Sequence, residues 1–266
     1  MSWNVADAGD DLPDLDDRLV EPESRYEMLD GELVYVPPAD SPHGDLHAQL
    51  CALIEIHARP GFRVSCDLLT RTSRIDDIAP DVSIYPAGPD PTTGRRQLQT
   101  LVFEVVSTQS LRNAARKAAK FAARGVRRVF AIDVERERAL EWSATLGAWR
   151  VLDAAGVITD PVLAVPLPIA SLIRFAIVDD AIARALVAKR NPVIEAALAA
   201  GKATGLAEGK ATGLAEAVIA VLAARGLAVD AAARVRILSE RDQARLARWI
   251  ALASSCASAA DLLAAP

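Results

Sequence analysis

The sequence predicts an α/β fold, in which a sheet is flanked by helices and followed by an α-helical C-terminal tail. Residues 100–106 and 129–134 are almost continuous runs of apolar and β-branched residues, which are typical of strands covered on both faces. Between them, residues 111–124 have the apolar spacing of a helix. After residue 179 the chain is rich in alanine and has no strand signals. This order of strands and helices predicts an α/β core.

The N-terminal part predicts an arm and a hairpin. Residues 1–20 are acidic and interrupted by proline, which predicts a flexible acidic arm. From Tyr26 to Val36, apolar residues flank Asp30-Gly31, a dipeptide that favours a two-residue turn between antiparallel strands. Glu32 then begins the second strand of the hairpin.

A helix and two extended segments should follow this hairpin. Ser41 and Pro42 suit the N-cap and the first position of a helix, which we expect over residues 42–58. Residues 61–72 should be extended, and residues 78–85 predict one strand of the central sheet.

The remaining elements complete one domain. The helix over residues 111–124 should end at Gly125, because glycine is common just past a helix C-terminus. Residues 139–143 and 148–152 predict a hairpin. Together these elements define an expected domain over residues 21–178.

The tail over residues 179–266 contains the octapeptide Gly-Lys-Ala-Thr-Gly-Leu-Ala-Glu twice, at 201–208 and 209–216. Its glycines recur one helical turn apart and would leave a narrow groove for another helix. They are Gly201, Gly205, Gly209 and Gly213. We therefore expect the tail to be an oligomerisation or partner-binding module that produces a homodimer or a higher homo-oligomer. A flexible linker is an interpretation of comparable weight.

Composition and charge narrow the function. The chain has 266 residues, of which 52% are hydrophobic, and a net charge of -5. This charge argues against a protein that coats nucleic acid with its whole surface, but not against a local basic patch. Residues 95–128 carry nine Lys or Arg against one acid, Glu104, so this segment favours contacts with a polyanion.

The cysteines indicate reduced thiols. Cys51, Cys66 and Cys256 have no CxxC spacing, and their odd number fits a cytoplasmic protein better than a disulfide framework. No secretory signal and no membrane span is predicted. His43, His47 and Cys51 recur every four residues, as on the face of a zinc site, but no fourth ligand is visible.

Two carboxylates are the candidates for chemistry. Asp81 and Glu104 each lie in or beside an apolar strand, where an unpaired charge is costly to bury. Alone, each would most simply be a turn residue or half of an ion pair. If their strands are neighbours, the two carboxylates can converge and bind a hard divalent ion such as Mg²⁺. Lys117, on the following helix, could reach the same point as a cationic stabiliser.

Several short motifs occur in a recognisable order. They are Asp30-Gly31-Glu32-Leu33, Ser41-Pro42-His43, Pro80-Asp81, Glu104-Val-Val-Ser107, the helix that bears Lys117, and Gly125-Val126 leading into Val129-Phe-Ala-Ile-Asp133. Together they resemble the Uma-type family of putative restriction endonucleases, a branch of the PD-(D/E)xK nuclease superfamily. The resemblance covers roughly residues 22–175 and implies a restriction-endonuclease-like mixed sheet flanked by helices.

The resemblance also implies site residues. Asp81, Glu104 and the backbone carbonyl of Val105 would bind the divalent metal. Glu32 would add a further acidic residue to the catalytic site. In the simple motif the lysine follows the glutamate by two residues, where this chain has Val106. Lys117, on the following helix, matches the position to which the motif lysine has moved.

The implied activity is that of a metal-dependent endonuclease that hydrolyses phosphodiester bonds, with DNA as the expected substrate and Mg²⁺ as the cofactor, Mn²⁺ being a substitute. The expected nucleic-acid contacts are His43, Arg112, Arg116 and Lys120. The alternative is a catalytically degenerate nuclease fold that acts as a DNA-binding or scaffold module. Asn113 favours this alternative, because family members often carry an aspartate there.

Overall fold

The computed structural model describes residues 12–264, apart from residues 23, 39–40, 107–110 and 175–176. The chain divides into two compact units, Met1–Lys189 and Arg190–Pro266. Among the described residues, no helix combines the length and the apolar composition needed to cross a membrane.

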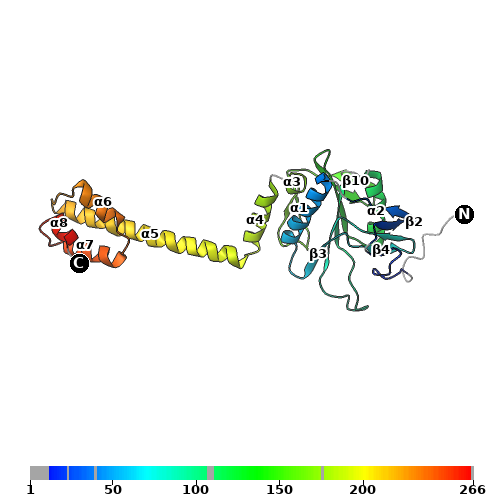
Figure 1. Ribbon diagram of the computed structural model, residues 1–266, viewed down its shortest axis with the longest axis horizontal. Helices are drawn as coiled ribbons and strands as arrows, with labels where there is room; N and C mark the ends of the chain where they lie inside the picture. Colours follow the sequence, from blue (N-terminus) through cyan, green and yellow to red (C-terminus); the bar gives the residue numbers. More distant parts are fainter. Residues whose placement is uncertain (1–11, 23, 39–40, 107–110, 175–176, 265–266) are drawn as a thin grey trace. The chain divides into compact units, whose positions relative to one another are not determined.

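The first unit is built on a six-stranded mixed sheet (Figure 1). Its strands, in spatial order, are β10 (Ala148–Val151), β9 (Arg138–Ser143), β8 (Arg128–Asp133), β7 (Leu101–Val106), β6 (Val82–Pro86) and β3 (Phe62–Cys66). Strands β7 and β8 are parallel and connected by α2 (Leu111–Arg124), whereas the other neighbours are antiparallel. The predicted α/β fold with a mixed sheet is therefore confirmed.

Two helices cover the sheet, α1 (Ser41–His57) and α2 (Figure 1). The side chains of β7 alternate between them, because successive strand residues point to opposite faces. Phe103 belongs to the core that contains Leu53 of α1, and Val102 belongs to the core that contains Phe121 of α2. Glu104 has the same parity as Val102, so it points to the α2 side of the sheet.

A smaller sheet contains the predicted hairpin. Its order is β2 (Glu32–Tyr35), β1 (Tyr26–Leu29), β5 (Asp76–Ile78) and β4 (Thr70–Ser73). The turn between β1 and β2 has positive φ at both central residues, 57° at Asp30 and 77° at Gly31. This is the backbone that an Asp-Gly hairpin turn requires, so the predicted hairpin is confirmed.

The single strand predicted over residues 78–85 is wrong. β5 ends at Ile78, β6 begins at Val82, and the two strands belong to different sheets. Pro80 cannot donate a ladder hydrogen bond, so a continuous strand is interrupted there. Asp81 therefore lies where the chain crosses from one sheet to the other.

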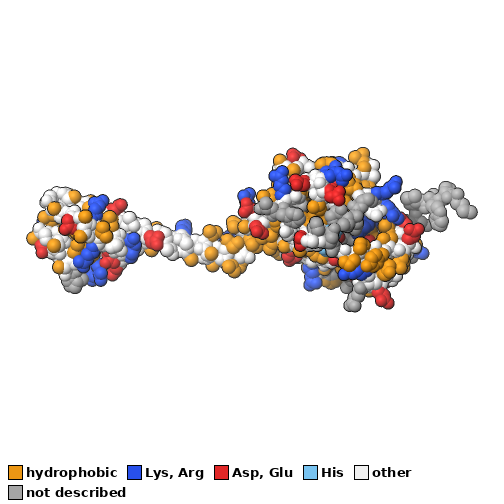
Figure 2. Space-filling model, turned by 45° about the horizontal axis from the view of Figure 1, so that its top comes forward, with side chains coloured by type: hydrophobic (Ala, Val, Ile, Leu, Met, Phe, Trp, Pro, Cys, Tyr) orange, Lys and Arg blue, Asp and Glu red, His pale blue; other side chains and the backbone are white. Residues whose placement is uncertain are grey.

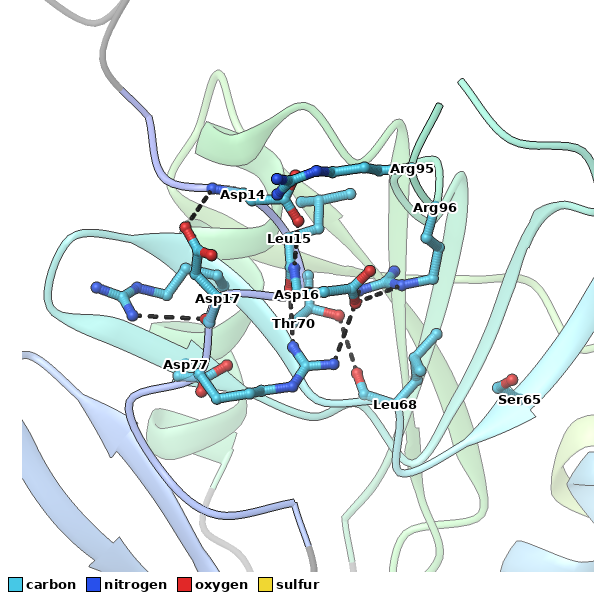
Figure 3. Close-up of polar contacts among 12 residues, drawn as sticks. Asp14, Leu15, Asp16, Asp17, Ser65, Leu68, Thr70, Asp77, Arg95 and Arg96 are labelled. Atoms are coloured by element: carbon cyan, nitrogen blue, oxygen red, sulfur yellow. Dashed lines mark hydrogen bonds and ion pairs between the residues drawn. The ribbon is translucent and has the colours of Figure 1, made fainter. Parts of the chain in front are cut away.

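Residues 12–20 lie on the domain, which differs from the flexible arm that the sequence predicts. Asp14 pairs with Arg95 at 2.6 Å, and Asp16 pairs with Arg96 at 3.1 Å (Figure 3). The acids of this segment thus neutralise arginines that are distant in sequence. The first 11 residues of the predicted arm are outside the described part of the chain.

The helix and hairpin predicted after β7 are confirmed. α2 ends at Arg124, and Gly125 has a φ of 114°, which only glycine adopts readily. β9 and β10 form the expected hairpin, with Gly147 at a φ of 58°.

The first unit continues beyond the boundary predicted at residue 178. It contains a short sheet of β11 (Val157–Ile158) and β12 (Leu167–Pro168), and the helices α3 (Ala170–Ile173) and α4 (Val178–Ala188). α4 packs against α1, and its buried Ala181 joins the core on that side of the sheet. The compact unit therefore includes α4.

The second unit consists of helices α5 (Pro192–Ala224), α6 (Ala231–Ser239), α7 (Gln243–Ala253) and α8 (Ala259–Ala264). The Asn191 side chain caps α5 by accepting hydrogen bonds from two backbone amides. A separate core includes Leu222 of α5, Ile237 of α6 and Trp249 of α7. The octapeptide repeat lies inside α5, and a Cβ added at any of its four glycines would meet no described atom within 4 Å other than its chain neighbours and the adjacent backbone of α5.

The cysteines differ from the sequence-based expectation of reduced thiols. Cys51 of α1 and Cys66 at the end of β3 are joined by a disulfide, and Cys256 is free. The packing of α1 against β3 brings the two sulfurs together. Their sequence separation of 15 residues does not reveal this packing.

Candidate active site

Asp81 and Glu104 lie side by side where β6 and β7 meet. Val82 pairs with Phe103 in antiparallel register, so the residue before Val82 is placed opposite the residue after Phe103. Asp81 Oδ2 also accepts a hydrogen bond from the backbone amide of Val105 at 2.5 Å. The structure thus brings together the two carboxylates and the Val105 backbone of the predicted metal site.

Lys117 reaches this point from α2. Its Nζ lies 3.3 Å from Glu104 Oε2 and 3.3 Å from Glu27 Oε1, and it donates to the Ala79 carbonyl at 2.5 Å. The ammonium group is held inside the domain, because Lys117 shares the buried face of α2 with Phe121. Lys117 is only 5% exposed, so it is a buried ion-pair partner and not part of a solvated helix face.

The hairpin contributes Glu27 to this cluster. Besides pairing with Lys117, Glu27 Oε1 accepts a hydrogen bond from the Ala79 amide at 3.0 Å. Glu32, which the sequence predicts for this role, is exposed at the start of β2, and its side chain forms no hydrogen bond or ion pair with another described residue. Glu27 precedes the buried Leu29 by two residues in β1. Because alternate strand residues share a face, this spacing could have placed Glu27 on the same face as Leu29, but it could not have revealed the contact with Lys117.

Two histidines of α1 and one aspartate surround Asp81. His43 Nε2 lies 3.8 Å from Asp81 Oδ1, and His47 Nε2 lies 2.5 Å from the Asp81 carbonyl oxygen. The same carbonyl accepts the backbone amide of Asp67 at 3.3 Å. His43 is thus placed at the candidate site, and His47 and Asp67 lie next to it because both contact the Asp81 carbonyl oxygen.

Burial and neighbouring charges set opposite pKa shifts on the two carboxylates. Burial raises the pKa of Glu104 to about 8, although the Lys117 ammonium opposes this shift. Burial also acts to raise the pKa of Asp81, but His43 and the Lys117 charge outweigh it and hold this pKa below its usual value. The negative charges of Glu104 and Glu27 overcome the effect of burial on Lys117 and raise its pKa. Lys117 therefore stays charged at neutral pH.

The oxygen atoms of this cluster fit a hard divalent cation. Glu104 is fully buried, and among the described residues its Oε1 has no hydrogen-bond partner. An uncompensated buried carboxylate oxygen is costly, and a cation is a partner that would compensate it. Asp81 and the Val105 carbonyl would supply further oxygen ligands next to Glu104. The donor set is therefore the one that Mg²⁺ or Mn²⁺ prefers.

Most of the predicted nucleic-acid contacts are already paired with acids. Arg116 and Lys120 each approach Asp30 at 2.5 Å, and Lys120 also contacts Asp76 at 2.8 Å. Arg112 is exposed at the start of α2. The basic residues of segment 95–128 that form ion pairs with carboxylates are Arg95, Arg96, Arg116, Lys117, Lys120, Arg127 and Arg128. On the face of the first unit seen in Figure 2, the Lys and Arg side chains of the described residues lie among Asp and Glu side chains and form no continuous basic patch.

Two other residues of the sequence motifs do not add to the cluster. Asn113 is exposed on α2, one turn before Lys117. Ser107 lies outside the described residues.

Comparison with known proteins gives two findings. The model of the Uma2 family, described as putative restriction endonuclease, matches residues 10–168. A crystal structure from Anabaena variabilis ATCC 29413, described as a putative nuclease belonging to DUF820, resembles the chain with 15% sequence identity and a TM-score of 0.46, covering 55% of this chain and 88% of that chain. Among curated proteins, no sequence matches significantly. The family match includes Asp81, Glu104 and Lys117 and ends before the helical unit.

Proposed function

Because the chain belongs to the Uma2 family of putative restriction endonucleases, we propose that it is a metal-dependent endonuclease that hydrolyses phosphodiester bonds in DNA. The observation that carries this proposal is the buried cluster of Asp81, Glu104 and Lys117, in which one oxygen of Glu104 has no hydrogen-bond partner among the described residues. As an enzyme that acts on cellular DNA, it would work in the cytoplasm.

The residues of the cluster have distinct roles in this proposal. Asp81, Glu104 and the Val105 carbonyl would hold Mg²⁺, or Mn²⁺ as a substitute. The bound ion would lower the pKa of a water molecule and neutralise charge that develops on the phosphate. Lys117 would orient the attacking water or stabilise the transition state, because its charge is fixed at the same point. Glu27 would hold the Lys117 ammonium in place.

His43 would serve Asp81 and the substrate. Its imidazole keeps Asp81 ionised, as the lowered pKa of that carboxyl indicates, and its position beside the carboxylate suits contact with a phosphate. Arg112 is exposed and can contact the DNA backbone directly. Arg116 and Lys120 would contact it only by exchanging their carboxylate partners for phosphates.

The test is cleavage of double-stranded DNA and of RNA by the full chain, with Mg²⁺, with Mn²⁺ and with EDTA. We expect cleavage of DNA that requires the metal and is lost in Asp81→Ala and in Glu104→Ala, while circular dichroism shows that both variants are folded. Arg234→Ala, in the helical unit, is the matched control and should cleave like the wild type.

Two other outcomes would change the proposal. Cleavage that continues in both carboxylate variants would refute the assignment of the site. Salt-dependent DNA binding without turnover under any metal condition would favour the catalytically degenerate DNA-binding or scaffold module, to which the exposed Asn113 points.

The helical unit would mediate self-association into a homodimer or a higher homo-oligomer. Its support is the face of α5 on which the repeat glycines are open to an approaching helix. Leu198 and Leu206 of the same helix are 62% and 71% exposed, so apolar side chains accompany the glycines.

A further inference from the structure

A second group of ligand atoms lies next to the carboxylate cluster and has a different chemistry. A ring nitrogen of His47 and the sulfurs of Cys51 and Cys66 all lie within 4.8 Å of one another. One nitrogen and two sulfurs suit a borderline ion such as Zn²⁺, whereas Mg²⁺ prefers oxygen ligands.

The fold assembles this group from two elements. His47 and Cys51 are four residues apart in α1, so their side chains share one face of the helix. Cys66 is the last residue of β3, which packs against α1. It takes the place in the ligand set that the sequence spacing suggests for His43, whose imidazole lies beside Asp81 instead. The spacing of His47 and Cys51 on one helix therefore indicates two ligands of a zinc site, and the third ligand, Cys66, comes from a strand.

We propose that reduction of the Cys51–Cys66 disulfide creates a thiolate–imidazole site for Zn²⁺, with His47 as the third protein ligand. A dithiol reductant supplies two electrons and two protons, so that the sulfur–sulfur bond breaks, two thiols form and the reductant becomes a disulfide. Zn²⁺ then binds both sulfurs, and the two thiol protons pass to solvent.

The fourth position of the site is available to Asp67 or to water. Asp67 directly follows Cys66, and its carboxylate lies within 4.8 Å of a ring nitrogen of His47. Both Cys66 and Asp67 are exposed, so a reductant and an ion can reach them from solvent. Zinc sites with three protein ligands commonly take water as the fourth ligand.

This site is linked to the candidate active site through one carbonyl oxygen. His47 Nε2 and the Asp67 amide both bond to the backbone oxygen of Asp81. A histidine that binds a metal with one nitrogen commonly bonds a carbonyl or carboxylate with the other, so this contact is of the kind that orients a ligand. The existence of the zinc site does not depend on the proposed nuclease activity.

The test is Co²⁺ binding by the full chain. Co²⁺ takes the place of Zn²⁺ because its absorption spectrum depends on which atoms bind it. The protein is reduced with dithiothreitol, freed of it under nitrogen, and titrated with Co²⁺. We expect a thiolate-to-cobalt band in the near ultraviolet that reaches its full intensity at one Co²⁺ per sulfur cluster and is lost when Zn²⁺ displaces the ion. The oxidised protein should show no such band.

Matched variants identify the ligands. Cys51→Ser and Cys66→Ser should lose the thiolate band, and His47→Ala should weaken Co²⁺ binding by more than about tenfold. Cys256→Ser and Glu104→Gln should keep the band, because neither residue belongs to the sulfur cluster. A thiolate band that survives Cys51→Ser or Cys66→Ser, or one that requires Cys256, would overturn the proposal.

A measurement on the wild type avoids any dependence on how the variants fold. In the reduced protein, Zn²⁺ should protect Cys51 and Cys66 from iodoacetamide, while Cys256 reacts as before, and peptide mass spectrometry reports each site. Equal modification of Cys51 and Cys66 with and without Zn²⁺ would refute the site.

Discussion

Glu27 and Glu32 lie on the same face of the β1–β2 hairpin but in different surroundings. Glu27 is opposite Val34, and Glu32 is opposite Leu29 beside the turn. Glu27 is buried against Lys117, whereas Glu32 is exposed. The difference in burial, and not the direction of the side chain, separates the two acids.

We therefore expect Glu27→Gln to lower kcat/KM for DNA cleavage by roughly tenfold to a hundredfold, because Lys117 loses a charged partner that positions it. Glu32→Gln should retain the wild-type rate. Initial cleavage rates at saturating Mg²⁺ check both variants, and thermal melts establish that they fold. If Glu32→Gln lost as much activity as Glu27→Gln, the role would return to Glu32.

The raised pKa of Glu104 predicts how stability depends on pH in the metal-free protein. Between its usual value of 4.5 and about 8, the folded state keeps a proton that the unfolded chain has released. The unfolded state then binds fewer protons, so the free energy of unfolding falls as pH rises through this window. Glu104→Gln should remove this contribution, and urea unfolding in EDTA at several pH values would show a shallower decline. Parallel pH profiles for the two proteins would contradict the prediction.

At this scale the sequence predicts the candidate residues that lie on or beside the central strands and on α2. Asp81, Glu104 and Lys117 follow from the apolar runs, the helical period and the motif order. Glu27, Cys66 and Asp67 do not, because their positions depend on which sheet each strand joins and on the packing of α1 against β3. The acids that neutralise Arg116 and Lys120 are likewise distant in sequence.

Two glycines in different elements should respond oppositely to the same substitution. Gly125 follows α2 with a φ of 114°, where alanine is strained, so Gly125→Ala should lower the stability of the first unit by about 1 kcal/mol or more. Gly205 lies inside α5 with open space around it within one chain, so Gly205→Ala should stabilise the second unit by about 1 kcal/mol at chain concentrations too low for self-association.

Thermal unfolding followed by calorimetry measures both glycine variants, because each unit has its own core. Destabilisation by Gly205→Ala in dilute protein would contradict the prediction, whereas destabilisation that appears only at high chain concentration would mean that a helix of a second chain uses the space beside that glycine.

At the scale of elements, periodicity and turn chemistry predict most of the first unit. Asp30-Gly31 and Gly125 lie at positive φ as their turn and cap require. The prediction fails over residues 78–85, where apolar content suggests one strand but Pro80 interrupts the ladder. Whether a strand continues in its sheet or crosses to another is decided by its neighbours, which local sequence does not specify.

The whole molecule consists of two units with separate cores, which leads to a prediction about assembly. A chain that ends at Lys189 should fold, because the described residues of this core all belong to the first unit. It should also form a smaller species than the full chain, since the glycine face of α5 is removed. Light scattering coupled to gel filtration measures both masses. An unchanged number of chains per particle would refute the assembly role of the tail.

The pairing of the basic segment with acids changes what binding to DNA would involve. A free cationic surface releases solution ions from DNA, and its affinity falls steeply with added salt. Here carboxylates such as Asp14, Asp30 and Asp160 already act as counterions within the protein. Phosphates would have to displace these carboxylates from the basic side chains, so binding would release fewer solution ions from the DNA and the protein for each basic residue involved. The affinity for a duplex would then depend less on its charge than on whether its backbone fits the site at Asp81 and Glu104.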